Sequence, residues 1–133
     1  MYDIQEHAVF AQAAGAAMNR ERLARVATFA GTGTGNYTDC HEYRISCPEH
    51  LSEDLLRSFR ITPALLRKWR SKGELFQISL FIREGKLIGG RIHKHRPIPG
   101  DPPGISYLTT PTRQEIRITE RLLRYLSEKD AVL

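Results

Sequence analysis

The sequence predicts an α+β fold in a single domain over residues 1–133, because segments with helical periodicity and segments with strand alternation follow one another along the chain. A chain of 133 residues suits one hydrophobic core. Three observations carry the prediction: two capped helices within residues 52–73, a hairpin over residues 76–93 and a helix over residues 112–129. With residues 3–29, they predict an N-terminal helix, a helix-turn-helix-like pair, an antiparallel hairpin or small sheet, and a C-terminal helix.

Residues 3–29 predict the N-terminal helix, with a break at Asn19, because apolar residues recur there at helical spacing. The glycine-rich run GTGTGN, residues 31–36, ends this helix. A dinucleotide-binding loop would follow a strand and precede a helix, whereas this run follows a helix and precedes a strand-like segment. We therefore favour a connector or hairpin loop over nucleotide binding.

Residues 41–47, HEYRISC, alternate between apolar and polar side chains and predict a strand. Ser52 or its neighbour is expected to cap a first short helix. Thr62 is expected to cap a second helix, with Pro63 at its first position, where the missing N–H costs nothing. Gly73 is expected to end that second helix.

Apolar residues alternate along both arms of the predicted hairpin, which turns around residues 84–86. A three-residue loop places Ile82 opposite Ile88 and Ile78 opposite Ile92, so that every apolar position falls on one face. The other face then carries Gln77, Ser79, Arg83, Arg91 and His93.

Residues 96–104, RPIPGDPPG, contain four prolines and two glycines and predict an extended, stiff surface loop. A short strand is expected within residues 105–109. The C-terminal helix follows, and its apolar stripe consists of Ile116, Leu122, Leu123 and Leu126.

Positive charge is concentrated in the middle of a chain whose net charge is +5. From Arg57 to Arg96 there are eleven Lys and Arg against two acids, Glu74 and Glu84, so this segment has a net charge of +9 and the rest of the chain −4. The alternative is an ordinary solvated surface, but the asymmetry favours a polyanionic partner. We take residues 51–96 as the candidate nucleic-acid-binding core.

Residues 55–75, LLRSFRITPALLRKWRSKGEL, resemble the winged helix-turn-helix of the excisionase and mercury-regulator type. The apolar positions that this family needs are occupied by Leu55, Phe59, Ile61, Leu66 and Trp69. The sequence departs from the family at Leu56, where a small residue is usual, and at Arg60, where a turn glycine is usual. The resemblance implies a short recognition helix followed by a hairpin that acts as a wing.

At 100° per residue, the helix expected at residues 62–72 has two faces. The apolar face consists of Thr62, Leu65, Leu66 and Trp69. The opposite face consists of Ala64, Arg67, Lys68 and Ser71, and it suits a groove because Arg binds guanine edges and Lys and Ser reach phosphates. The predicted nucleic-acid contacts are Arg60, Arg67, Lys68, Arg70, Ser71, Lys72, Arg83, Lys86 and Arg91.

We therefore expect a small basic protein that binds nucleic acid, preferably duplex DNA, as a transcriptional regulator or mobile-element accessory factor, with a homodimer left open. One alternative is a protein-interaction adaptor or inhibitor that uses the basic face. Another is a small enzyme or ligand-binding domain with a pocket under the antiparallel sheet. Single-stranded DNA or RNA binding is a variant of the nucleic-acid prediction, with Phe81 and Tyr107 as stacking platforms. Trp69 packed under the hairpin with Arg67 exposed would favour DNA, whereas a deep apolar cavity under the sheet would favour a ligand.

Cys40, His41, Cys47 and His50 lie within eleven residues, CHEYRISCPEH. In a strand, the adjacent Cys40 and His41 point to opposite sides, so we expect half-buried cysteines and surface histidines rather than a zinc site. No nucleophile, base or carboxylate pair converges in the sequence, and no catalytic residue, metal or cofactor is assigned. Two cysteines, no export signal and no long apolar run predict a cytoplasmic protein without membrane contact.

Overall fold

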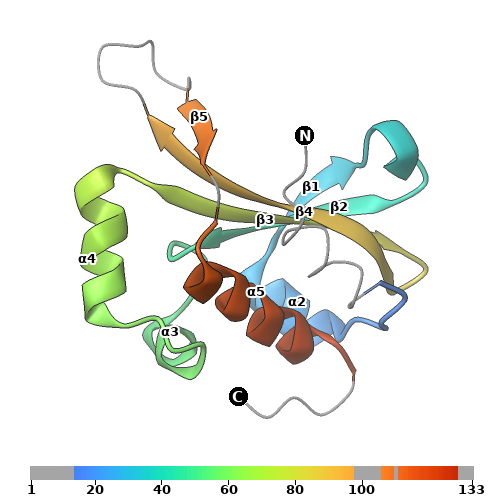
Figure 1. Ribbon diagram of the computed structural model, residues 1–133. Coiled ribbons are helices and arrows are strands. Elements are labelled where there is room, and N and C mark those ends of the chain that lie inside the picture. The colour runs from blue at the N-terminus through green and yellow to red at the C-terminus, as the bar shows by residue number, and fades with distance from the viewer. Residues whose placement is uncertain (1–13, 98–105, 110, 129–133) are drawn as a thin grey trace.

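The computed structural model describes residues 14–97, 106–109 and 111–128, and these form a five-stranded antiparallel sheet with helices beneath it and at one end (Figure 1). The strands lie in the sheet in chain order, β1 to β5. The α+β class predicted from the sequence is confirmed. The elements are α2 (Arg20–Val26), β1 (Thr28–Thr32), the 3-10 turn η1 (Gly35–Tyr37), β2 (His41–Cys47), α3 (Glu53–Ser58), α4 (Pro63–Lys72), β3 (Leu75–Arg83), β4 (Lys86–Pro97), β5 (Ser106–Thr109) and α5 (Arg113–Leu126).

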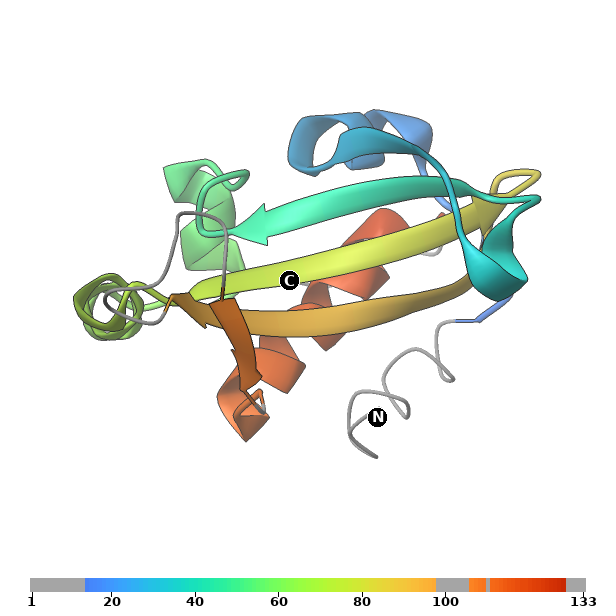
Figure 2. The same ribbon diagram turned by 90° about the horizontal axis from the view of Figure 1, so that it is seen from above.

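One face of the sheet packs on α2 and α5 and forms the core, as the view from above shows with α5 behind the strands (Figure 2). The sheet contributes buried side chains at alternate positions, namely Ile45, Cys47, Phe76, Ile78, Leu80 and Ile92. The predicted apolar stripe of the C-terminal helix is confirmed, because Ile116, Leu122, Leu123 and Leu126 are all buried. Burial of this stripe contributes about 1.5–3 kcal/mol per large apolar side chain.

The N-terminal prediction is partly wrong. Residues 3–13 lie outside the described part of the chain, and the described helix begins only after Asn19, whose side chain accepts a hydrogen bond from the Arg22 N–H at 3.1 Å. The helix does not reach residue 29, because Thr28–Thr32 form β1 and pair with β2. Thr28 and Phe29 suit a strand better than a helix, and the partner strand supplies the hydrogen bonds that a longer helix would have made.

The run GTGTGN forms the end of β1 and the turn into β2, so the hairpin-loop interpretation is confirmed. Tyr37, from this turn, stacks on Phe81 of β3 with ring centroids 4.2 Å apart and an interplanar angle of 2°. Gly33 and Gly89 make this stack possible, because a Cβ at either position would overlap Tyr37. Gly33 and Gly89 therefore allow the close approach of Tyr37 to the sheet.

The local signals of the two short helices are confirmed. The Ser52 side chain accepts a hydrogen bond from the Leu55 N–H, and the Thr62 side chain accepts one from the Leu65 N–H. Gly73 ends α4 in the left-handed conformation, with φ of 63°.

The β3–β4 hairpin has the predicted overall register but a different turn. Glu84 and Gly85 both have positive φ, 53° and 78°, and form a two-residue turn between Arg83 and Lys86. Ile82 therefore pairs with Leu87, and the expected pairing with Ile88 is wrong. A register shift beyond Ile82 then restores the predicted pairing of Ile78 with Ile92. The β-bulge thus produces the pairing of Ile78 with Ile92 that the prediction attributed to a three-residue loop.

The Pro-rich segment is described only at its start. Arg96 and Pro97 are the last residues of β4 rather than part of a loop, because they pair with Tyr107 and Ser106 of β5. The remaining residues of the predicted loop, 98–104, lie outside the described part of the chain. The short strand predicted before the last helix is confirmed as β5.

Candidate nucleic-acid interface

Helix α4 stands at one end of the sheet, with one side turned away from the rest of the molecule (Figure 1). Leu65 and Trp69 are buried, Leu66 is partly buried and Thr62 is exposed, whereas Arg67, Lys68, Arg70 and Lys72 are exposed. The predicted division into a core face and a basic face is therefore present for all of these residues except the N-cap Thr62. None of the four cations forms an ion pair with an acid in the described ranges. Ser71 is exposed, and its hydroxyl donates to the Lys68 carbonyl at 3.0 Å.

Trp69 fixes the orientation of α4. Its indole ring lies over Phe76 of β3 with ring centroids 6.1 Å apart and an interplanar angle of 23°. Its Nε1–H donates to Glu115 Oε2 of α5 at 2.6 Å. Because this side chain joins α4 to both the hairpin and α5, the exposed face of α4 is held in a defined direction.

A buried ionic cluster lies behind Trp69 and was not predicted from the sequence. Lys94 Nζ lies 3.3 Å from Glu74 Oε2 and 3.2 Å from Glu115 Oε1, and all three side chains are less than one tenth exposed. Lys94 and Glu74 both belong to the segment whose net charge of +9 indicates a polyanionic partner, but both are internal and neither contributes to its exposed charge. The position of Lys94 two residues after Ile92, on the apolar face of β4, is the sequence signal that indicates its burial.

The carboxylate of Glu115 remains ionised inside this cluster. Burial raises the pKa of Glu115, but the backbone N–H of Thr112, the Trp69 indole and the Lys94 ammonium lower it further, so the net pKa lies below the ordinary 4.5. Glu115 Oε1 accepts from the Thr112 N–H at 2.8 Å, and Thr112 Oγ1 accepts from the Glu115 N–H at 3.2 Å. This capping box makes Glu115 both a helix cap and the partner of a buried cation.

Arg60 occupies a backbone position that normally requires glycine. It has φ of 60° and follows the end of α3. The Ile61 N–H donates to the Leu56 carbonyl and the Arg60 N–H donates to the Arg57 carbonyl, both at 2.9 Å. These two bonds define a Schellman motif with Arg60 at its left-handed position, where a side chain costs free energy.

The same motif ends α4 with a glycine in the corresponding position. There the Glu74 N–H donates to the Trp69 carbonyl at 2.9 Å, and the Gly73 N–H donates to the Arg70 carbonyl at 3.2 Å. The residue in the left-handed conformation is therefore Gly73 after α4 but Arg60 after α3. Arg60 is exposed, so the core does not explain why a large cation stands there.

The predicted hairpin cations do not gather with α4. Arg83 and Lys86 flank the hairpin turn, at the opposite end of the sheet from α4 (Figure 1). Along the nine residues of β3, this separation is about 30 Å. Arg83 forms an ion pair with Asp39 at 2.6 Å, which lowers the pKa of Asp39. Arg91 lies over the ring of Phe81 at 5.8 Å, on the sheet face opposite the core.

Phe81, one of the two residues expected to stack on single-stranded nucleic acid, is not accessible for stacking. Phe81 is 2% exposed because Tyr37 covers its ring. The side chain of Tyr107 lies outside the described part of the structure.

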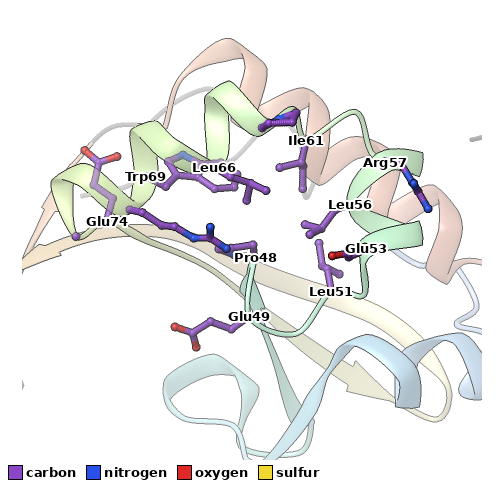
Figure 3. Close-up of a pocket in the computed structure, with 13 residues that line it drawn as sticks. Pro48, Glu49, Leu51, Glu53, Leu56, Arg57, Ile61, Leu66, Trp69 and Glu74 are labelled. Carbon is purple, nitrogen blue, oxygen red and sulfur yellow. The ribbon is translucent and has the colours of Figure 1, made fainter.

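A groove opens between α3, α4 and the loop that follows β2, with a volume of about 780 Å³ (Figure 3). It lies beside the sheet rather than beneath it, where the ligand-binding alternative placed a pocket. Its apolar lining consists of Pro48, Leu51, Leu56, Ile61, Pro63, Leu66 and Trp69. Its charged lining consists of Glu49, Glu53, Arg57, Arg70 and Glu74. Both acids and cations line this groove, so it has no single preferred ligand charge.

The Cys and His residues of CHEYRISCPEH are dispersed. Within the described residues there is no group of three or more His, Cys, Asp or Glu side chains arranged to hold a metal ion. Cys47 lies in the core, and burial raises its pKa to about 12. His50 Nδ1 accepts a hydrogen bond from the Ser46 N–H at 2.9 Å.

The fold and the site define an α+β protein with one basic helix displayed at the end of an antiparallel sheet. Comparisons with models of known families, with curated proteins and with solved structures found no match. In the part of the chain that the structure describes, no helix has the length and apolar character needed to span a membrane.

Proposed function

We propose that this protein binds duplex DNA by placing the exposed face of α4 in a groove, as a transcriptional regulator or an accessory factor of a mobile element. The observation that carries the proposal is the set of four exposed cations on α4 that form no ion pair with a described residue. Arginine and lysine in this state are available to phosphates and to guanine edges.

The contacts fall into two kinds. Arg67 is exposed on the side of α4 opposite the buried Leu65 and Trp69, and it is the candidate for base contact, with the small Ala64 permitting close approach. Lys68 and Lys72 lie to one side of Arg67 and are assigned to phosphates, as is Arg60 at the end of α3. The buried Trp69 and the exposed Arg67 support this proposal over a ligand site under the sheet. The hairpin cations Arg83, Lys86 and Arg91 do not lie with α4 and are not part of the proposed interface.

Reversing the charge of two α4 residues, Arg67→Glu with Lys68→Glu, is expected to weaken binding to random duplex at low salt by about a hundredfold or more, because two contacts are each worth roughly 1–3 kcal/mol. Fluorescence anisotropy with a labelled duplex measures the effect. The stability of the fold should change by less than about 0.5 kcal/mol, since both side chains are exposed.

The matched control is Arg20→Glu with Arg25→Glu, which makes the same change of net charge on two exposed residues of α2. It should weaken binding only slightly. Equal losses in the two variants would show attraction to net charge alone and would contradict a site on α4, as would unchanged binding in the α4 variant.

Substituting Arg60→Gly is expected to stabilise the fold by about 1 kcal/mol, because glycine adopts the left-handed conformation without a Cβ clash. The same substitution should weaken duplex binding by about tenfold through loss of one phosphate contact. Urea denaturation and anisotropy measure the two effects, and Arg60→Lys, which keeps both the charge and the strain, is the control. Duplex binding as tight as wild type in the glycine variant would remove Arg60 from the interface.

A further inference from the structure

Helix α5 carries a line of arginines on its outer side. Arg113, Arg117, Arg121 and Arg124 are spaced four, four and three residues apart, which places them within a sector of about 80° on a helix of 100° per residue. Arg113, Arg117 and Arg124 are exposed and Arg121 is partly buried. The opposite side of the helix is buried in the core. We call these four residues the arginine stripe.

The stripe is electrostatically strained in the free protein. Arg121 has a lowered pKa, first because it is partly buried and then because Arg60, Arg124 and Arg117 repel its charge. Glu120 acts in the opposite direction but does not outweigh them. None of the four arginines forms an ion pair with an acid in the described residues. An anion bound along the stripe would relieve this repulsion.

Arg60 connects the stripe to the helix pair. The Arg121 guanidinium donates to the carbonyl of Phe59, the residue before Arg60, at 2.7 Å, so the end of α3 lies against the middle of α5. The hydrogen bond from Trp69 to Glu115 brings α4 against the first turn of α5. The stripe therefore begins beside α4 and passes the strained Arg60.

The shape of the stripe indicates the class of anion. Eleven residues separate its ends, which is about 17 Å along a helix. A row of cations of that length suits a chain of phosphates, whereas a single phosphate or small anion would use only one or two of them. A membrane surface fits less well, because the apolar side of α5 is already buried in the core and cannot enter a bilayer.

We propose that the arginine stripe, together with Arg60, binds the sugar–phosphate backbone of the duplex whose groove α4 enters. This inference rests on the proposed function. The stripe would fix the position of the duplex without reading its sequence, since phosphate contacts carry no base information. The interface would then extend from α4 onto α5, beyond the segment that the charge distribution of the sequence indicates.

The test compares double variants in duplex titrations at several salt concentrations. Arg117→Gln with Arg124→Gln removes two exposed stripe residues and spares Arg121, whose side chain bonds to the backbone. Arg67→Gln with Lys68→Gln removes the same charge from α4, and Arg20→Gln with Arg25→Gln removes it from α2. The stripe variant should reduce the slope of log affinity against log salt by about 2 and weaken unrelated duplex sequences by the same factor.

The outcomes separate the two proposals. A stripe variant that matches the α2 control, while the α4 variant is weakened, overturns the stripe and leaves the proposed function standing. A stripe variant that is weakened while the α4 variant matches the control overturns the role of α4, and with it the proposal that one duplex contacts both helices. Absence of duplex binding by the wild type at low salt overturns both. Binding to phosphatidylserine vesicles in place of duplex, lost in the stripe variant, would assign the stripe to a membrane surface and overturn the backbone proposal.

Discussion

Replacing Lys94 by Met is expected to lower the free energy of unfolding by about 3–5 kcal/mol at pH 7, because it leaves two buried carboxylates without their cation. Glu74 and Glu115 lie 3.3 and 3.2 Å from the ammonium group, and both are less than one tenth exposed. Their mutual repulsion then adds to the cost of burial. Urea denaturation followed by circular dichroism measures the loss.

The pH dependence of stability in the Lys94→Met variant tests whether the unpaired carboxylates cause the loss. In the wild type the pKa of Glu115 lies below 4.5, so its contribution to stability is present above that pH and is lost as the pH falls through the folded pKa. In the Lys94→Met variant, loss of the ammonium group raises the pKa of Glu115 relative to the wild type, so acid protonates this carboxyl at a smaller cost. The deficit relative to wild type should therefore shrink between pH 7 and pH 4.

Two further variants make the test strict. Lys86→Met removes an exposed lysine at the start of the same strand and should change stability by less than about 0.5 kcal/mol. Lys94→Met combined with Glu74→Gln and Glu115→Gln should recover part of the loss, because no uncompensated charge remains. A Lys94→Met protein as stable as the Lys86→Met protein would show that the cluster is not a structural element.

Replacing Trp69 by Ala is expected to cost about 3–5 kcal/mol through the cavity left between α4, β3 and α5. Trp69→Phe keeps the ring beside Phe76 but removes the N–H that donates to Glu115, and should cost about 1.5–3 kcal/mol. Loss of that donor also raises the pKa of Glu115, so the Phe variant should lose stability in acid at a higher pH than the wild type.

A comparison with Leu66→Ala tests whether the loss of stability is specific to Trp69. Leu66 is only partly buried and lines the groove, so Leu66→Ala should cost less than Trp69→Ala in the same denaturation experiment. Equal costs would mean that Trp69 has no special role in anchoring α4. A Phe variant with the acid sensitivity of the wild type would contradict the assigned hydrogen bond.

The features that the sequence predicts well depend on neighbours along the chain. The caps at Ser52 and Thr62 and the glycine stop at Gly73 need only a side chain and the next few backbone groups. The two faces of α4 follow from helical geometry in the same way. These predictions hold whatever the rest of the fold does.

The features that escape prediction depend on distant partners. β1 forms because β2 is available to pair with it, and the hairpin register depends on a bulge beyond a two-residue turn. The hairpin cations separate from α4 because β3 and β4 are long strands in the middle of a five-stranded sheet. Lys94 is buried because Glu74 and Glu115, from other parts of the chain, pair with it. Its spacing of two residues from Ile92 was the one indication of this burial in the sequence.

The ionic cluster behind Trp69 has a consequence for recognition. Lys94, Glu74 and Glu115 join β4, the end of α4 and the start of α5, so α4 is already ordered and oriented before any partner arrives. Under the proposed function, association then pays little entropy for ordering the helix. Binding energy from its cations goes into affinity rather than into folding, and the complex should form by docking of two rigid surfaces.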